Sequence, residues 1–270
     1  MTPTGGTGGT TTGGSGGTAS GGSGGNGDTG GTSGQGAGDA GVGTGGTGEG
    51  PADGGVPSDG GTGPAPSGSK ILLLFSSHEQ PFIIPGMQET LAAHGPVVTF
   101  DLNKGTFSAD MAVAMGASVI VIGPSCKRAQ IQGSPGLKEL AIPIIVSKDG
   151  PAGDLGMATG DFTTPNDQHS INIVATGDPL AAGFPNGPVM VMGPPNRVVN
   201  GVPGPEAKIV ATLVGQATRA CIFYYLKGQN MIGGLKAPAK RIGFFWHRPV
   251  EATDNGKKLL GAAVDWAREP

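Results

Sequence analysis

Residues 71–79 decide the fold of this chain, and they read Ile-Leu-Leu-Leu-Phe-Ser-Ser-His-Glu. The first five are apolar and pass directly into a polar loop. A short apolar run bounded by polar residues is typical of a strand buried on both faces of a parallel sheet. We therefore predict the first and most central strand of a doubly wound α/β domain. Because ligands of such sheets bind beyond the carboxyl ends of the strands, we expect Ser76, His78 and Glu79 to lie at a binding site.

Strands and helices are expected to alternate in the first half of the folded region, as in βαβ units around a parallel sheet. The later strands are expected to follow one another through short turns, as antiparallel additions to one edge. The predicted fold is therefore α/β, with a mostly parallel sheet and added antiparallel strands. The expected strands are 71–75, 96–102, 119–122, 142–147, 171–174, 189–192, 208–213, 219–226 and 241–246, and the expected helices are 85–94, 108–115, 137–140 and 255–267.

Residues 1–69 differ in composition from the rest of the chain. They contain 30 of the 54 glycines, mixed with Thr, Ser, Asp and Pro, and almost no large apolar side chain. Such a segment cannot bury enough surface to offset its conformational entropy, so we predict a disordered low-complexity linker. The folded domain is then expected at 70–270, about 200 residues, which is enough for one substantial core.

The charge of the domain is nearly balanced. Five of the 20 acidic residues precede Lys70, which leaves 15 in the domain against 17 basic residues. This balance, without a basic run, argues against nucleic acid as a partner. The glycines form no dinucleotide-binding pattern after a strand, so we predict no cofactor. No apolar run is long enough to span a bilayer, so we predict no transmembrane segment.

The composition of the linker bears on where the protein is located. A Gly/Thr/Ser-rich tether before a compact domain is typical of the region that follows the anchor of an exported or lipid-attached protein. The first residues, Met-Thr-Pro-Thr-Gly-Gly, lack the basic and apolar stretches of a signal peptide. We expect that a signal lies upstream and that the protein is exported or a cell-surface lipoprotein; a cytoplasmic protein is the alternative.

The two cysteines, Cys126 and Cys221, are far apart in the sequence. Neither has a Cys or His neighbour at metal-ligand spacing, and we predict no metal site. They form either one disulfide, if the protein is exported, or two buried free thiols.

Several segments together resemble one known family. They are 71–77, 142–147 (Ile-Pro-Ile-Ile-Val-Ser), 177–184 (Gly-Asp-Pro-Leu-Ala-Ala-Gly-Phe), 237–245 and 254–267. In this order they resemble the trehalose-utilisation (ThuA-like) branch of the class I glutamine amidotransferase-like superfamily, over essentially 70–267. The resemblance implies a flavodoxin-like fold with its site at the carboxyl edge of the sheet.

The resemblance also indicates which activity is missing. Active members of the superfamily carry a nucleophilic cysteine on a sharp Gly-x-Cys-x-Gly turn, and a His followed by Pro and Glu after a late strand. The corresponding turn here is 146–150, Val-Ser-Lys-Asp-Gly, which has no cysteine. His247 precedes Pro249 and Glu251, which is only a loose version of the second motif. Without the thiol we expect no amidotransferase activity.

Polar residues that follow the strands are the candidate binding residues. Four of them have side chains suited to acid/base catalysis on a sugar or to metal ligation, if the fold brings them together: His78, Glu79, Asp149 and His247. Residues that only cap the strand ends are the alternative. His169, in a loop rich in Gly and Pro, is expected to be exposed. The full candidate set is Ser76, His78, Glu79, Ser125, Lys148, Asp149 and His247.

Three functions are open on this basis. The first is a tethered ThuA-like domain that binds a small polar ligand, such as a carbohydrate, without amidotransferase activity. The second is an enzyme that acts on sugars through a His/Asp/Glu site. The third is a structural module of the cell envelope with a vestigial site. Convergence of His78, Asp149 and His247 would favour the enzyme, and apolar filling of the crevice would favour the structural module.

Overall fold

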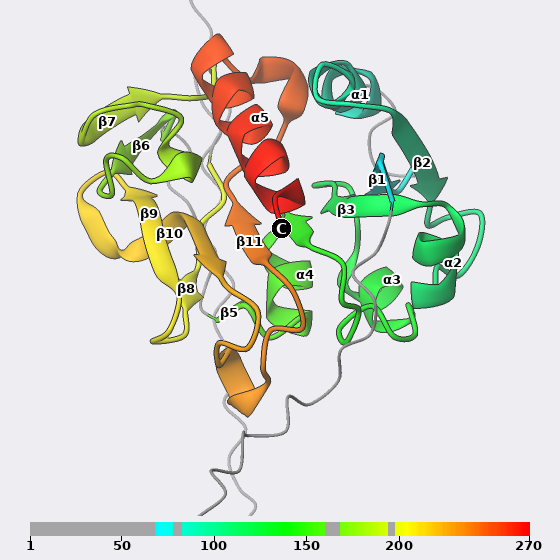
Figure 1. The fold of residues 1–270 in the computed structure, drawn as a ribbon. Coiled ribbons are helices and arrows are strands. Elements are labelled where there is room, and N and C mark those ends of the chain that lie inside the picture. Colours follow the sequence, from blue (N-terminus) through cyan, green and yellow to red (C-terminus); the bar gives the residue numbers. More distant parts are fainter. Residues whose placement is uncertain (1–67, 78–82, 160–167, 194–197) are drawn as a thin grey trace, which may run out of the picture. The chain divides into compact units, whose positions relative to one another are not determined.

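The computed structural model describes residues 68–77, 83–159, 168–193 and 198–270, all within one unit of the chain, 57–270. The predicted linker therefore lies outside the described residues, except for Gly68 and Ser69. Strands and helices alternate as far as α4, and strands predominate afterwards (Figure 1). In chain order the elements are β1 (Lys70–Phe75), α1 (Ile83–Ala92), β2 (Val97–Asp101), α2 (Ala109–Ala114), β3 (Ala117–Ile122), α3 (Arg128–Gln132), β4 (Ile144–Val146), α4 (Asp149–Asp154), β5 (Ala158–Thr159), β6 (Ser170–Ile173), η1 (Pro179–Ala181), β7 (Gly187–Met190), β8 (Val202–Pro203), β9 (Lys208–Leu213), β10 (Gln216–Tyr225), η2 (Ile232–Gly234), β11 (Arg241–Phe244), η3 (Pro249–Glu251) and α5 (Asp254–Arg268).

A nine-stranded sheet runs through the described residues in the order β2-β1-β3-β4-β11-β10-β9-β6-β7. The strands from β2 to β11 pair in parallel. The strands beyond β11 pair antiparallel with their neighbours, and Figure 1 shows them on the opposite side of the molecule from β1 and β2. The sheet confirms the predicted doubly wound, flavodoxin-like α/β fold with antiparallel strands added at one edge.

β1 is not the most central strand, and that prediction was wrong. It lies second from the β2 edge, whereas β11 occupies the middle of the sheet. Its apolar run is nevertheless buried on both faces. Ile71 and Leu73 belong to one hydrophobic core, and Leu72 and Leu74 belong to another. The pattern of the run indicates that helices cover both faces, but it does not fix the position of the strand within the sheet.

Helices cover the sheet on both faces, which gives three layers. α1 and α5 contribute Met87, Leu91, Leu259 and Val264 to the core on one face, and α5 crosses in front of β11 in Figure 1. The short helices α2, α3 and α4 pack against the other face.

The closing helix was predicted almost to the residue. α5 begins after Thr253, whose Oγ1 accepts a hydrogen bond from the backbone N of Gly256 (3.3 Å), as expected for an N-cap. The N-cap of α2 at Ser108 is likewise confirmed.

The predicted helix at 137–140 does not form, and α3 lies earlier in the chain instead. The carbonyl groups of Lys138, Leu140 and Ile142 accept hydrogen bonds from the guanidinium of Arg241, at 3.4, 2.6 and 2.9 Å. Arg241 is fully buried, and burial lowers its pKa to about 9. These carbonyl groups accept the hydrogen bonds of the buried Arg241 guanidinium instead of those of a helix. The segment therefore forms turns.

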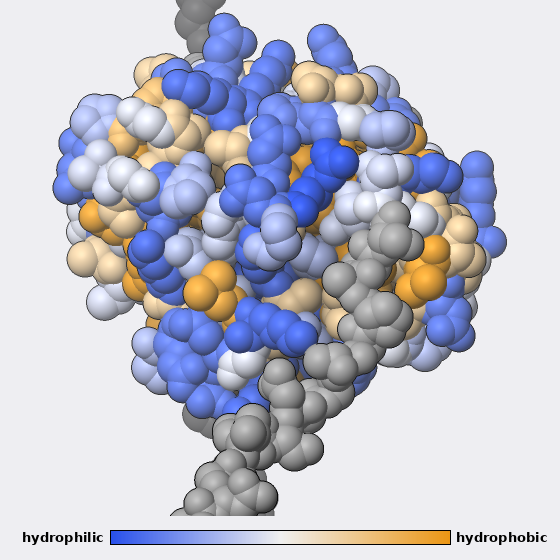
Figure 2. Space-filling model, viewed as in Figure 1, coloured by the Kyte–Doolittle hydropathy of each residue, from blue (hydrophilic) through white to orange (hydrophobic). Residues whose placement is uncertain are grey.

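Hydrophilic side chains cover much of the face shown in Figure 2, and hydrophobic residues form separate small patches on it. Large hydrophobic residues that are exposed lie on different elements, such as Val113 on α2, Met190 on β7 and Val250 on η3. Scattered residues of this kind are normal on a protein surface.

Candidate functional site

Polar side chains join the carboxyl ends of β1, β2 and β3. Ser125 follows β3, and its Oγ accepts a hydrogen bond from the backbone N of Ser76 (3.0 Å). The Ser76 hydroxyl donates to Oδ1 of Asn103, after β2 (3.1 Å). Gln130, on α3, donates from Nε2 to Ser76 Oγ (3.3 Å) and to Asn103 Oδ1 (3.0 Å). The structure therefore brings together Ser76 and Ser125, two of the predicted residues, and both are buried.

Asp101 fixes the loop that follows β2. Its Oδ1 accepts hydrogen bonds from the backbone N of Ser77 (3.2 Å) and of Asn103 (3.0 Å). Burial raises the pKa of Asp101, but the hydrogen bonds from Ser77 and Asn103 and the charge of Lys104 lower it by more, so its pKa lies below the ordinary value. Asp101 is therefore an ionised carboxylate at neutral pH, and it ties the loop after β1 to the loop after β2.

A hollow of about 430 Å³ lies beside this network. It is lined by residues 102–106, from the loop after β2, and by Ala129, Gln130 and Gly133, from α3 and its end. Asn103 and Gln130 belong to both the network and the lining. The volume falls within the range of about 300–1,000 Å³ that is common for small-molecule sites.

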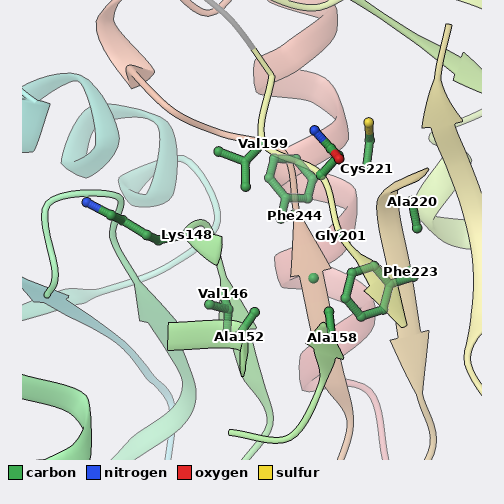
Figure 3. Close-up of a pocket in the computed structure, with 12 residues that line it drawn as sticks. Val146, Lys148, Ala152, Ala158, Val199, Gly201, Ala220, Cys221, Phe223 and Phe244 are labelled. Carbon is green, nitrogen blue, oxygen red and sulfur yellow. The ribbon is translucent and has the colours of Figure 1, made fainter. Parts of the chain in front are cut away.

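A second, narrow pocket lies near the carboxyl ends of β4 and β11 (Figure 3). It holds about 20 Å³, room for about one water molecule. Most of its walls are apolar, and Val146, Phe223 and Phe244 contribute to them. Lys148 also borders the pocket, but its side chain extends away from the aromatic rings in Figure 3. This part of the sheet edge is too tightly filled to hold a sugar.

The turn after β4 differs from a nucleophile turn in its backbone as well as in its sequence. Lys148 is the N-cap of α4 and has an extended conformation, with φ −144° and ψ 143°. A nucleophile turn needs a sharp, strained backbone that presents its side chain to the substrate. Lys148 instead occupies an ordinary helix start, and Ser147 before it is buried.

The predicted convergence of histidines and acids lies largely outside the described residues. His78 and Glu79 are among the residues that are not described, and so is the side chain of Asp149. His247 follows β11 and is half-buried, next to the fully buried Trp246. His169 is half-buried, with its Nδ1 atom shielded from solvent, so the expectation of an exposed residue was wrong.

Both cysteines lie in the described part of the chain, where they are buried thiols without a disulfide between them. The Sγ of Cys126 donates a hydrogen bond to the carbonyl of Leu74 (3.3 Å). Burial raises the pKa of the Cys221 thiol. A buried thiol with a raised pKa is a poor nucleophile.

Among the residues that the structure describes, no group of three or more His, Cys, Asp or Glu side chains is placed to hold a metal ion. No helix of this part is long and apolar enough to cross a membrane.

The residues that line the hollow are not among the candidate binding residues predicted from the sequence. Asn103 and Lys104 directly follow a strand, so the rule that selected Ser76 and Ser125 also selects them. Gln130 lies on a helix of five residues without apolar periodicity. No signal in the sequence places its side chain beside Asn103.

Several solved structures are similar to this chain. One of them, described as a ThuA-like protein from Bacteroides uniformis, has a TM-score of 0.46 and 11% sequence identity, over 79% of this chain and 95% of that chain. No family model matches the sequence, and no curated protein matches it. A TM-score and an identity this low transfer no property to this chain.

Proposed function

We propose that the chain is a ThuA-like domain without amidotransferase activity, and that it binds a small polar ligand, such as a carbohydrate, at the carboxyl edge of its sheet. The hollow beside Asn103 and Gln130 carries this proposal, because it combines adequate volume with polar lining at the edge where such folds bind ligands. The ThuA-like assignment is supported by the sequence resemblance. The absence of a cysteine from the turn after β4 supports the lack of amidotransferase activity.

Thermal melting of the full chain against a panel of mono- and disaccharides tests the proposal. A ligand that binds only the native state stabilises it by about 2.7 kcal/mol at a hundred times its dissociation constant. We expect at least one compound to raise the midpoint. Ala129→Trp, which fills the hollow, should abolish the shift, whereas Ala114→Trp, at an exposed position on α2 outside the hollow, should retain it. The proposal fails if no compound shifts the midpoint, or if Ala129→Trp leaves the shift intact.

A structural module of the cell envelope is the second candidate. It is favoured by the narrow pocket between β4 and β11, where apolar side chains fill the crevice in the way a vestigial site would. In that case no sugar should shift the melting midpoint of either the natural chain or the variants.

Under both proposals, the composition of residues 1–69 supports a tethered domain at the cell surface. External protease should then remove the domain from intact cells. Protection of the domain until the cells are lysed would contradict a surface location.

A further inference from the structure

The charge in the hollow narrows the class of its ligand, provided that the hollow binds a ligand as proposed. Lys104 lines the hollow with a side chain that is 82% exposed. Its ammonium group donates no hydrogen bond to another described residue. The Oδ2 of Asp101 lies 3.9 Å from Lys104 Nζ, which is beyond hydrogen-bond distance. The ammonium is therefore available to a molecule that enters the hollow.

Two neighbours of Lys104 add further donors. Gly105 and Thr106 also line the hollow. Among the described residues, neither their backbone N–H groups nor the Thr106 hydroxyl has a hydrogen-bond partner. Successive backbone N–H groups and a nearby cation together favour the binding of anions.

The amide side chains of the lining offer fewer free acceptors. Oδ1 of Asn103 already accepts hydrogen bonds from Ser76 and Gln130. Oε1 of Gln130 accepts one from the backbone N of Lys127 (2.8 Å). A neutral sugar needs acceptors as well as donors for its hydroxyl groups, whereas an anion needs only donors. The side chains that remain available suit the anion better.

The nearest acidic group does not cancel this preference. The side chain of Asp101 is only 6% exposed, whereas that of Lys104 is 82% exposed, and Asp101 does not line the hollow. The N-cap of α3, Lys127, and its first residue, Arg128, are also basic, and Arg128 pairs with Asp154 (2.8 Å). An entering molecule therefore meets the ammonium of Lys104 before it meets a carboxylate.

We infer that the ligand of this hollow carries an acidic group, a carboxylate or a phosphate, which binds to Nζ of Lys104 and the hydroxyl of Thr106. Hydrogen bonds between charged partners are shorter and stronger than neutral ones. The acidic group thus anchors the molecule, and the rest of it extends across the hollow toward Gln130.

Three probes with the same six-carbon skeleton test this inference: glucose, gluconate and glucose 6-phosphate. Each is titrated calorimetrically into the full chain at low salt. We expect at least one of the two acidic probes to bind about tenfold more tightly than glucose, the gain from one charge-assisted hydrogen bond. Added salt should reduce this advantage, because the lysine is exposed.

Variants of exposed lysines assign the effect to the hollow. Lys104→Met should remove the advantage of the acidic probes, and Lys104→Arg should retain most of it. Lys227→Met is the matched control, because Lys227 is an exposed lysine in the turn after β10 and does not line the hollow; it should change nothing. Equal binding of glucose and gluconate, or an advantage that survives Lys104→Met, overturns the inference and leaves the proposed function standing. No binding by any of the three probes also overturns it, and the saccharide panel then decides the proposed function separately.

Discussion

At the scale of single residues, burial determines the chemistry of Cys221. Its side chain lies on β10, in the wall of the narrow pocket, and only 1% of the residue is exposed. Burial disfavours the thiolate and raises the pKa of the thiol. The same burial that makes Cys221 unsuitable as a nucleophile also makes the stability of the fold depend on pH in the alkaline range.

The direction of this dependence follows from the raised pKa. The ordinary pKa of a cysteine thiol is about 8.5. Below that pH the Cys221 thiol is protonated in both the folded and the unfolded chain, so its contribution to the unfolding free energy is complete. Above that pH only the unfolded chain ionises, so stability falls by up to about 1.4 kcal/mol per pH unit. Cys221→Ala should reduce the loss of unfolding free energy between pH 8.5 and 10, measured by urea denaturation. The contributions of Arg241 and the tyrosines are present in both proteins and cancel. Equal slopes for the two proteins would show that the fold does not raise the pKa of the Cys221 thiol.

At the scale of elements, one hydroxyl group both caps α5 and links it to β7. Oγ1 of Thr253 caps the helix through Gly256 and also donates to the carbonyl of Met190 at the end of β7 (3.0 Å). Thr253→Ala should therefore reduce the unfolding free energy by about 1–2 kcal/mol in urea denaturation. Thr253→Ser keeps the hydroxyl and should lose far less. If the serine variant were as unstable as the alanine variant, the methyl group rather than the hydroxyl would be responsible.

The elements also show which parts of the fold the sequence can predict. α5 and β9 were located almost to the residue, because caps and apolar periodicity are local signals. The helix expected at 137–140 failed, because the carbonyl groups of that segment serve Arg241, which is about a hundred residues away in the chain. The same limit applies to the polar network at the sheet edge: Ser76 and Ser125 follow strands and were expected at this edge, whereas Gln130 reaches Ser76 only through tertiary packing.

At the scale of the whole molecule, the sheet combines two halves with different pairing. The parallel half, from β2 to β11, follows from the alternation of strands and helices. The antiparallel half adds four strands beyond β11, and this places β11 rather than β1 at the centre. The sequence pattern predicts that strands are added to one edge, but it does not show how far they shift the centre of the sheet.

The start of the folded domain provides the last prediction. Gly68 packs against the backbone of Gly116 and Ala117, and the carbonyl of Ser69 accepts a hydrogen bond from Arg268 (3.0 Å). Residues 1–67 have few apolar side chains to bury, so their removal should change the unfolding free energy by less than about 0.5 kcal/mol. Removal of 1–69 also deletes the bond to Arg268, and should cost about 1 kcal/mol more. Urea denaturation of the two truncated chains and the full chain measures both differences. A large loss on removing 1–67 alone would show that this segment docks on the domain, contrary to what its composition predicts.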